Sequence, residues 1–373
     1  MKTKVFSLIA SLLFTGSIVM AQDSAETEEV VAEESVEATE ETEANKLSIS
    51  GSVDLFYNYD FAGTNNMNIP VSFNEGQNSI NLGMANVILS QTLGKASFVA
   101  DLSFGPRSNS SIGSGNFHIQ NLYASYQLTE KLSATAGFMG TFVGYEVISP
   151  TGNFNYSTSY LFSNGPFQNA GLKFDYSFSD RVALMVGVFT NEWDSYNASP
   201  ELGMSGIGAQ LYLAPVDGLD IYLNGFSSST RTVADITAGY QVTDAFYLGL
   251  NAAWADKKDQ YTDGLATADQ AYTGVALYGQ YALSESFALG LRYENFADTY
   301  KPTGDNTLEE STVNVNAFTL SGNIALGPLT VIPEFRYDAA DTEVFFGSKE
   351  KEAADTFDSK SATQATLAVV YAF

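Results

Sequence analysis

Hydrophobic and polar residues alternate along the chain from residue 46 to its last residue. In segment 47–60, Leu55, Tyr57 and Tyr59 fall on one face, while Asp54 and Asn58 fall on the other. Successive side chains of a β-strand point to opposite faces, so the pattern predicts strands with one apolar and one polar face. Sixteen such segments begin near residues 47, 79, 95, 115, 131, 165, 180, 201, 218, 231, 244, 269, 285, 312, 328 and 361.

The connections between these segments form two alternating sets. The short ones lie at 93–95, 129–130, 179–180, 216–218, 243–244, 284–285 and 327–328. The other set has one short member, at 229–231, and long polar members at 62–78, 107–114, 146–164, 194–200, 257–268, 299–311 and 341–360. Short turns on one rim, long loops on the other and an even strand number are typical of outer-membrane barrels.

The expected fold is therefore all-β: a transmembrane antiparallel β-barrel of about 16 strands over residues 46–373, with short periplasmic turns and long external loops. The alternative for alternating strands is a soluble β-sandwich. The polar faces of these segments carry charges and small residues, which a dry core between two sheets would not accept. The barrel is the better interpretation.

Two segments precede the predicted barrel. Residues 1–21 have a basic start and a mostly apolar stretch that ends at Val19-Met20-Ala21, as expected for a cleaved signal peptide. Residues 22–45 follow, and positions 23–43 contain ten acidic residues and no basic one. Such a segment cannot bury enough apolar surface to fold, so we expect a disordered acidic lead-in that acts as a spacer.

Composition excludes several kinds of chemistry. The chain has no cysteine, and its one histidine, His118, is predicted to lie in a strand without a serine or a second histidine as a partner. We therefore expect no catalytic residue, no cofactor and no metal site. The acidic stretch 256–264 lacks the spacing of a calcium loop and is predicted to be an external loop. A formal net charge of −26 argues against nucleic acid as a partner.

Charged residues on the predicted inner faces are candidates for lining a pore. The same parity that turns the apolar face outward turns these residues inward: Asp54, Asp101, Lys173, Asp175, Arg292, Glu294, Glu334, Arg336 and Asp338. They could simply hydrate the wall and pair across strands. Alternatively, Arg292, Glu294, Glu334 and Arg336 face one another near a constriction and shape its electric field.

Loop 146–164 is long enough to fold into the barrel and narrow it. Its stretch 153–164 carries four aromatic rings that would otherwise be left in water: Phe154, Tyr156, Tyr160 and Phe162. We expect this stretch to pack against the inner wall as a constriction loop.

The last strand ends in an alternation of outward residues: Leu367, Val369, Tyr371 and Phe373. A terminal phenylalanine after such an alternation resembles the signal by which outer-membrane barrels are recognised by their assembly machinery. The expected role of these residues is therefore insertion.

Two stretches carry a resemblance to a known family. Residues 50–61 resemble the first strand of OmpL-like β-barrel porins of Gram-negative bacteria. Residues 137–174 resemble the third external loop of that family and its flanking strands, through Gly144-Tyr145-Glu146, Ser159-Tyr160-Leu161-Phe162, Pro166-Phe167 and Gly171. The resemblance implies passive diffusion of small solutes across the cell outer membrane.

Two functions remain open on these grounds. The first is a porin for small hydrophilic solutes, weakly cation-selective because six of the nine inward candidates are acidic. The second is a non-conducting barrel that serves as an adhesion or assembly platform through its external loops. The expected partners are outer-membrane lipid and the barrel assembly machinery, with a homotrimer by analogy with other porins.

Overall fold

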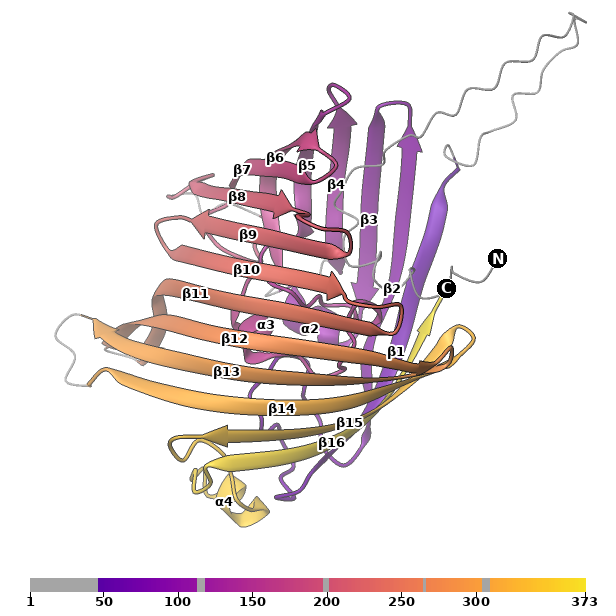
Figure 1. Ribbon diagram of the computed structural model, residues 1–373. Coiled ribbons are helices and arrows are strands. Elements are labelled where there is room, and N and C mark those ends of the chain that lie inside the picture. The colour runs from indigo at the N-terminus through magenta and orange to yellow at the C-terminus, as the bar shows by residue number, and fades with distance from the viewer. Residues whose placement is uncertain (1–45, 113–117, 197–200, 264–265, 304–308) are drawn as a thin grey trace, which may run out of the picture.

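The chain forms a closed barrel of antiparallel strands, in which each strand pairs with its sequence neighbours and β16 pairs with β1 (Figure 1). The computed structural model describes residues 46–112, 118–196, 201–263, 266–303 and 309–373. The strands are β1 (Ser48–Asp60), β2 (Ile80–Leu93), β3 (Ala96–Phe104), β4 (Ile119–Gln127), β5 (Leu132–Gly140), β6 (Gln168–Ser179), β7 (Val182–Phe189), β8 (Gly206–Leu213), β9 (Leu219–Ser227), β10 (Arg231–Gln241), β11 (Phe246–Asp263), β12 (Ala266–Ser284), β13 (Phe287–Thr303), β14 (Ser311–Leu326), β15 (Leu329–Ala340) and β16 (Ser361–Ala372).

The loops of the described residues contain the short helical segments α2 (Pro106–Ser111), η3 (Pro150–Gly152), α3 (Tyr160–Asn164) and α4 (Lys349–Ala353). Within the described ranges, no helix is long and apolar enough to cross a membrane. The expected signal peptide at 1–21 and the acidic lead-in at 22–45 lie outside the described residues.

The predicted all-β barrel of sixteen strands is confirmed, and no expected strand start lies more than five residues from the observed one. The predicted bounds of two loops, 257–268 and 299–311, are wrong. Residues 257–263 continue β11, and residues 299–303 continue β13. There Lys258 contacts Asp256 on its own strand at 3.2 Å and Asp269 across the hairpin, on β12, at 2.9 Å. A strand that continues beyond the apolar part of a barrel needs no apolar face, so its polar sequence is easily mistaken for a loop.

The two faces of each strand are inverted relative to a soluble protein. On β1, Val53 and Leu55 are each 44% exposed on the outside, whereas Ser52 and Asp54 are buried on the inside. The parity predicted from the sequence is therefore the parity observed. An apolar exterior around a polar interior is the arrangement of a barrel that lies in lipid.

Tight turns connect the strands on one rim. The two-residue turns after β2 and β14 place Gly94 and Gly327 at φ +59° and +67°. This left-handed backbone is accessible to glycine without strain, which explains a glycine at both turns.

The barrel closes between its first and last strands. Val53 pairs with Tyr371, and the backbones of Gly51 and Phe373 exchange two N–H···O bonds of 3.0 Å. The residues expected to form the assembly signal, Leu367, Val369, Tyr371 and Phe373, share the outer face of this seam, and three of them are exposed. Their role in insertion stays a prediction.

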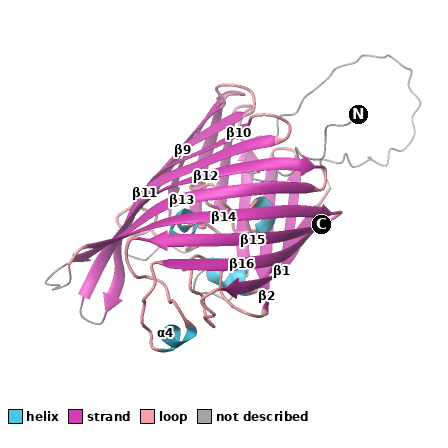
Figure 2. Cartoon of the chain, turned by 60° about the horizontal axis from the view of Figure 1, so that its bottom comes forward, coloured by secondary structure: helices cyan, strands magenta, loops and turns pink. Residues whose placement is uncertain are grey.

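Loops fill much of the barrel interior. The loop between β5 and β6, residues 141–167, is called the inward loop, because its backbone bonds to the inner faces of β13 and β15. Figure 1 labels its helix α3 behind the front strands, and Figure 2 shows short helices inside the barrel. Ile69 and Val71 of loop 61–79 and Phe345 of loop 341–360 join Leu161 of the inward loop in one buried cluster. The hydrophobic core thus lies within the lumen, under the external loops.

Candidate functional site

The inward loop brings three of the four expected aromatic residues into fully buried positions. Tyr156, Tyr160 and Phe162 are at most 5% exposed, and Phe154 is half-buried. Phe154 packs against Gly290 on β13, where an added Cβ would come within 2.2 Å of its ring. A glycine on the wall therefore provides the space for a loop ring.

Local hydrogen bonds shape this loop before it meets the wall. Asn153 accepts a bond from the Val147 N–H at 2.9 Å and donates one to the Val147 carbonyl at 2.6 Å. Ser159 caps α3, because its hydroxyl oxygen accepts a bond from the Phe162 N–H at 3.0 Å. These side chains satisfy backbone groups that would otherwise be unpaired in the turn.

Two carboxylates of the wall hold the backbone of the inward loop. Glu334 on β15 accepts bonds from the N–H groups of Tyr156 and Ser157, at 2.8 and 3.0 Å. Glu294 on β13 accepts bonds from those of Tyr160 and Leu161, both at 2.8 Å. Each carboxylate oxygen thus has one main-chain donor, an arrangement that stabilises a buried negative charge.

Two arginines hold the carbonyl groups of the same stretch. Arg292 contacts Glu146 at 2.7 Å and donates to the Ser157 carbonyl at 2.7 Å. Arg336 donates to the Thr158 carbonyl at 2.7 Å and forms two 2.9 Å bonds with Asp338. The Arg292 and Arg336 side chains are at most 1% exposed.

Tyrosine hydroxyls complete the attachment. Tyr156 donates to Asp54 on β1 at 2.5 Å, and Tyr160 donates to Asp338 at 2.8 Å. The ring of Tyr160 also lies 5.2 Å from the Arg336 guanidinium. We call strands β12–β16 and β1 the covered wall, because the inward loop lies over their inner face.

The opposite side of the lumen, strands β4–β9, is called the open wall because the charges on its inner face are half-buried; the start of the inward loop also reaches it, where Gln210 on β8 donates to the Phe142 carbonyl at 3.0 Å. Lys173 and Asp175 on β6 pair at 3.2 Å, with their side chains 15% and 24% exposed. Tyr212 on β8 donates to Asp220 on β9 at 2.6 Å, and its ring lies 5.0 Å from that of Tyr222. All of these inward side chains are half-buried rather than buried.

Asp101 on β3 lies beside the open wall. It is 8% exposed and accepts bonds from Asn86 at 3.1 Å and from Asn121 at 3.3 Å. On the next strands beyond β9, Asp235 accepts a bond from the Gly144 N–H of the inward loop at 3.1 Å. The hydrogen-bond donors to these two carboxylates are amide side chains and main-chain groups rather than cations.

The structure brings four of the predicted inward charges together, but under the loop. Arg292 and Arg336 both donate to the Thr158 carbonyl, and Glu294 and Glu334 bind the residues on either side of it. Their side chains therefore contact loop backbone rather than the open part of the lumen. Geometry of this kind fixes the position of the loop.

Sequence reasoning missed several residues of this site. Asp220 alternates with Leu219 and Ile221, so strand parity could have identified it. Glu146 and Arg107 lie in loop segments, where parity assigns no face, and nothing in the sequence predicts their burial. His118 lies one residue before β4, with φ +52°, and stacks on Phe104; it is not within a strand as the alternation predicts.

Among the described residues, no group of three His, Asp or Glu side chains could hold a metal ion. The site is therefore a set of paired charges, main-chain bonds and rings around an inward-folded loop. It can position a loop in a barrel and present charge on one side of the lumen.

Comparison with known proteins gives one family and several solved structures. The family described as "Putative beta-barrel porin-2, OmpL-like" matches residues 46–373. A comparison with curated protein sequences gives no match. The outer membrane channel DcaP of Acinetobacter baumannii has a TM-score of 0.55 at 13% identity, covering 89% of this chain and 99% of that one.

Two further structures are similar. Salmonella typhi OmpF in complex with daunomycin has a TM-score of 0.58 at 13% identity, over 88% of this chain and 98% of that one. The trimer form of Vibrio cholerae OmpT has a TM-score of 0.54 at 13% identity, over 89% of this chain and all of that one, 100%. At such identities the likeness shows the barrel fold.

Proposed function

Because the chain belongs to the OmpL-like family of β-barrel porins and is an outer-membrane protein, we propose that it lets small hydrophilic solutes diffuse passively between the inward loop and the open wall, with weak preference for cations. A sixteen-stranded barrel is wide enough to leave an aqueous passage. The inward loop occupies the covered side. The half-buried polar side chains of the open wall border the remaining space.

The observation that carries this proposal is the distribution of charge between the two walls. On the covered wall, Arg292, Glu294, Glu334, Arg336 and Asp338 are all paired or bonded to the loop and at most 5% exposed. On the open wall, Asp175 and Asp220 outnumber Lys173, and all three are half-buried. A water-filled passage with more negative than positive side chains concentrates cations.

The test is a planar-bilayer recording of the purified protein under a KCl gradient. The reversal potential should indicate cation preference at low salt and should approach zero as salt rises, because salt screens wall charges over about 10 Å at 0.1 M. Asp220→Asn should lower the preference, whereas the same change at Asp217 on the periplasmic rim should leave it nearly unchanged. Anion preference at low salt would contradict the proposal.

The alternative function is a non-conducting barrel that serves as an adhesion or assembly platform. The dense attachment of the inward loop favours it, because a loop held by two carboxylates and two arginines could close the lumen. Replacing residues 147–163 with a short glycine–serine linker distinguishes the two. Conductance in the intact protein supports diffusion, and conductance only after the replacement supports the platform.

The remaining proposals concern surroundings and partners. The exposed apolar side chains of the outer face are proposed to contact outer-membrane lipid, and the carboxyl-terminal alternation to contact the barrel assembly machinery. A homotrimer is proposed because a similar solved barrel is described as a trimer. No enzymatic activity is proposed for the chain, and assays of lipid and peptide hydrolysis on the purified protein test this.

A further inference from the structure

The barrel wall is interrupted at the outer end of β2. Strand β2 begins at Ile80, but its pairing with β3 begins at Ala85, opposite Phe104. Beyond Phe104 the chain turns at Gly105, with φ +110°, and continues as α2. The backbone of residues 80–84 therefore lacks a β3 partner, and the short helix α2 packs beside it instead.

A β-bulge lies next to this interruption, on the other edge of β2. The pairing of β1 with β2 shifts its register between Val53 and Leu55, opposite Gly83 and Met84. The Met84 N–H donates to the Asp54 carboxylate at 2.8 Å. A Cβ at Gly83 would lie 1.7 Å from an Asp54 oxygen, so a larger residue there would displace the Asp54 carboxylate. Such a bulge disrupts the β1–β2 ladder locally, on the edge of β2 opposite the missing β3 partner.

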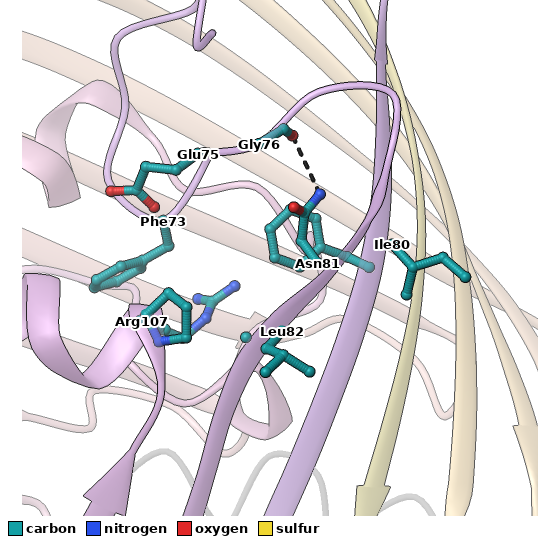
Figure 3. A pocket seen from close by; sticks show the side chains of 10 residues that line it. Phe73, Glu75, Gly76, Ile80, Asn81, Leu82 and Arg107 are labelled. Atoms are coloured by element: carbon teal, nitrogen blue, oxygen red, sulfur yellow. Dashed lines mark hydrogen bonds between the residues drawn. The ribbon is translucent and has the colours of Figure 1, made fainter. Parts of the chain in front are cut away.

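A cavity of about 310 Å³ lies at this interruption (Figure 3). Its lining combines the inward rings Phe56 and Phe73 with Ile80 and Leu82, which are 79% and 64% exposed on the outside of the barrel. The cavity thus adjoins both the lipid-facing surface and the packed interior. Its volume falls at the lower end of the roughly 300–1,000 Å³ of small-molecule pockets.

Arg107 of α2 borders the cavity and lacks its full set of acceptors. The side chain is buried, and its Nε and Nη2 atoms have no hydrogen-bond partner. Nη1 donates to the Ile148 carbonyl at 3.2 Å. The guanidinium lies between the rings of Phe73 and Tyr156, at 4.7 and 4.9 Å.

The nearest carboxylate does not satisfy this guanidinium. Asp54 lies 4.0 Å from the Arg107 Nε, and its oxygens already accept bonds from Met84 and Tyr156. A buried cation with unused donors is costly, and an incoming anion would lower that cost. The outer lip of the same cavity offers apolar side chains to a hydrocarbon chain.

We propose that this cavity binds an anionic amphiphile, with a carboxylate or phosphate headgroup directed to Arg107 and its hydrocarbon chain over Ile80 and Leu82. The donors of Arg107 select a negative headgroup. The apolar lip selects an attached chain over a free small anion. This site is separate from the passage for hydrophilic solutes, so neither proposal depends on the other.

Glu75 places a negative charge at the edge of the cavity, and this charge weakens the binding of an anion. Its side chain is at the exposed edge of the cavity, where it accepts a bond from the Ser110 hydroxyl at 3.2 Å. Figure 3 shows Glu75 on the Phe73 side and Asn81 on the other, where Asn81 donates to the Gly76 carbonyl at 3.3 Å. A headgroup that enters past Glu75 meets repulsion, so removal of this charge should strengthen binding.

Native mass spectrometry of the purified full-length protein in neutral maltoside micelles tests the proposal. Decanoate and decyl phosphate should each give one saturable adduct per chain. Decanol tests the need for the charge, and acetate and inorganic phosphate test the need for the chain. All three are expected to bind at least tenfold more weakly, since bonds to a charged group and burial of a chain each contribute that much.

Three variants locate the adduct. Arg107→Gln should weaken decanoate binding roughly tenfold or more, while Arg181→Gln, a matched change on the exposed periplasmic rim, should leave it unaltered. Glu75→Gln should tighten it about threefold by removing a like charge, and this exposed position keeps the test valid if Arg107→Gln fails to fold.

Three outcomes would overturn the proposal. Equal retention of decanol and decanoate would remove the role of the anion. Binding of acetate as tight as that of decanoate would make the ligand a free anion rather than an amphiphile. Decanoate binding that neither Arg107→Gln nor Glu75→Gln alters would place the adduct elsewhere on the barrel.

Discussion

The covered and open walls have the same strand pattern but hold their charges in opposite ways. On the covered wall, the charged side chains of Arg292 and Arg336 are at most 1% exposed and contact the inward loop. On the open wall, those of Lys173 and Asp175 are 15% and 24% exposed and contact each other. Alternation along a strand therefore assigns a charge to the inside of a barrel, but a loop decides whether water reaches it.

The difference also separates two roles of charge. A buried ion pair contributes little over an apolar substitute, yet loss of one partner leaves an uncompensated charge and costs about 3–5 kcal/mol. A partly hydrated pair contributes about 0–1 kcal/mol. Covered-wall charges should therefore control where the inward loop lies, and open-wall charges should control which ions pass.

The strongest test of this division removes the central cation of the covered wall. Arg292→Leu leaves Glu146 without its ion pair and Ser157 without its donor. We expect a loss of about 3–5 kcal/mol in loop attachment, seen in bilayer recordings as large, fluctuating conductance steps. Arg181→Leu, which breaks an exposed pair with Asp217, is the control. Steady, unaltered conductance in Arg292→Leu would contradict the role of the covered wall.

The seam of the covered wall gives a second, smaller effect. Phe373→Ala, or deletion of residues 371–373, should lower the outer-membrane level several-fold without affecting secretion, if the outward alternation is the insertion signal. Pulse-labelling and fractionation measure it. Phe357→Ala, on an external loop and similarly exposed, provides the comparison. Normal insertion of both seam variants would show that β16 is only a wall strand.

The same chemical change on each wall sharpens the comparison. Asp338→Asn weakens the partner of Arg336 and should lower the stability of the folded barrel, with a small effect on ion preference. Asp220→Asn should shift the reversal potential by a few millivolts and leave stability within about 0.5 kcal/mol. Urea unfolding and KCl-gradient recordings on both variants measure this. The interpretation of two separate roles fails if Asp338→Asn shifts the reversal potential without loss of stability, and Asp220→Asn lowers the stability without a shift in reversal potential.

The smallest predicted effect concerns pH and the end of the inward loop. Asp194 accepts bonds from the Phe167 and Gln168 N–H groups, at 2.6 and 2.8 Å. Burial raises its pKa to about 6, although these bonds and the charges of Lys257 and Arg231 lower it in part. Glu192 pairs with Arg231 nearby.

A raised pKa means that the folded protein binds the proton more tightly than the unfolded chain. The carboxyl of Asp194 therefore stabilises the fold below its ordinary pKa of 3.8, and this contribution is lost as pH rises through about 6. Asp194→Asn should thus gain stability relative to the wild type between pH 4 and 7.5, by on the order of 0.5 M in urea midpoint or less. A midpoint difference that does not change with pH would exclude this carboxyl as the cause.

Much of the barrel follows from local physical rules. Period-two alternation identifies the strands because lipid and water demand opposite faces, and Gly94 and Gly327 mark turns that need a left-handed backbone. These rules fail where a strand extends beyond the lipid, because it then needs no apolar face. At Lys258 the strand continues as a polar hairpin, and the sequence there predicts a loop.

The site is less predictable because it depends on contacts between distant segments. Glu146 and Arg292 are 146 positions apart, and no local pattern relates them. Parity correctly turns Arg292 inward, yet it gives no information on the loop that covers it. Arg107 illustrates the same limit, since it is buried on a short loop helix, α2, that packs beside β2.

The way in which Glu334 and Glu294 hold the loop has a consequence for sequence change. Both carboxylates bind main-chain N–H groups, at residues 156, 157, 160 and 161, and every amino acid except proline carries such a group. Substitutions at these positions can alter the size and polarity of the loop while its attachment to the wall is preserved. A barrel built in this way can acquire a different passage through mutations in one loop, without redesign of the strands that hold it.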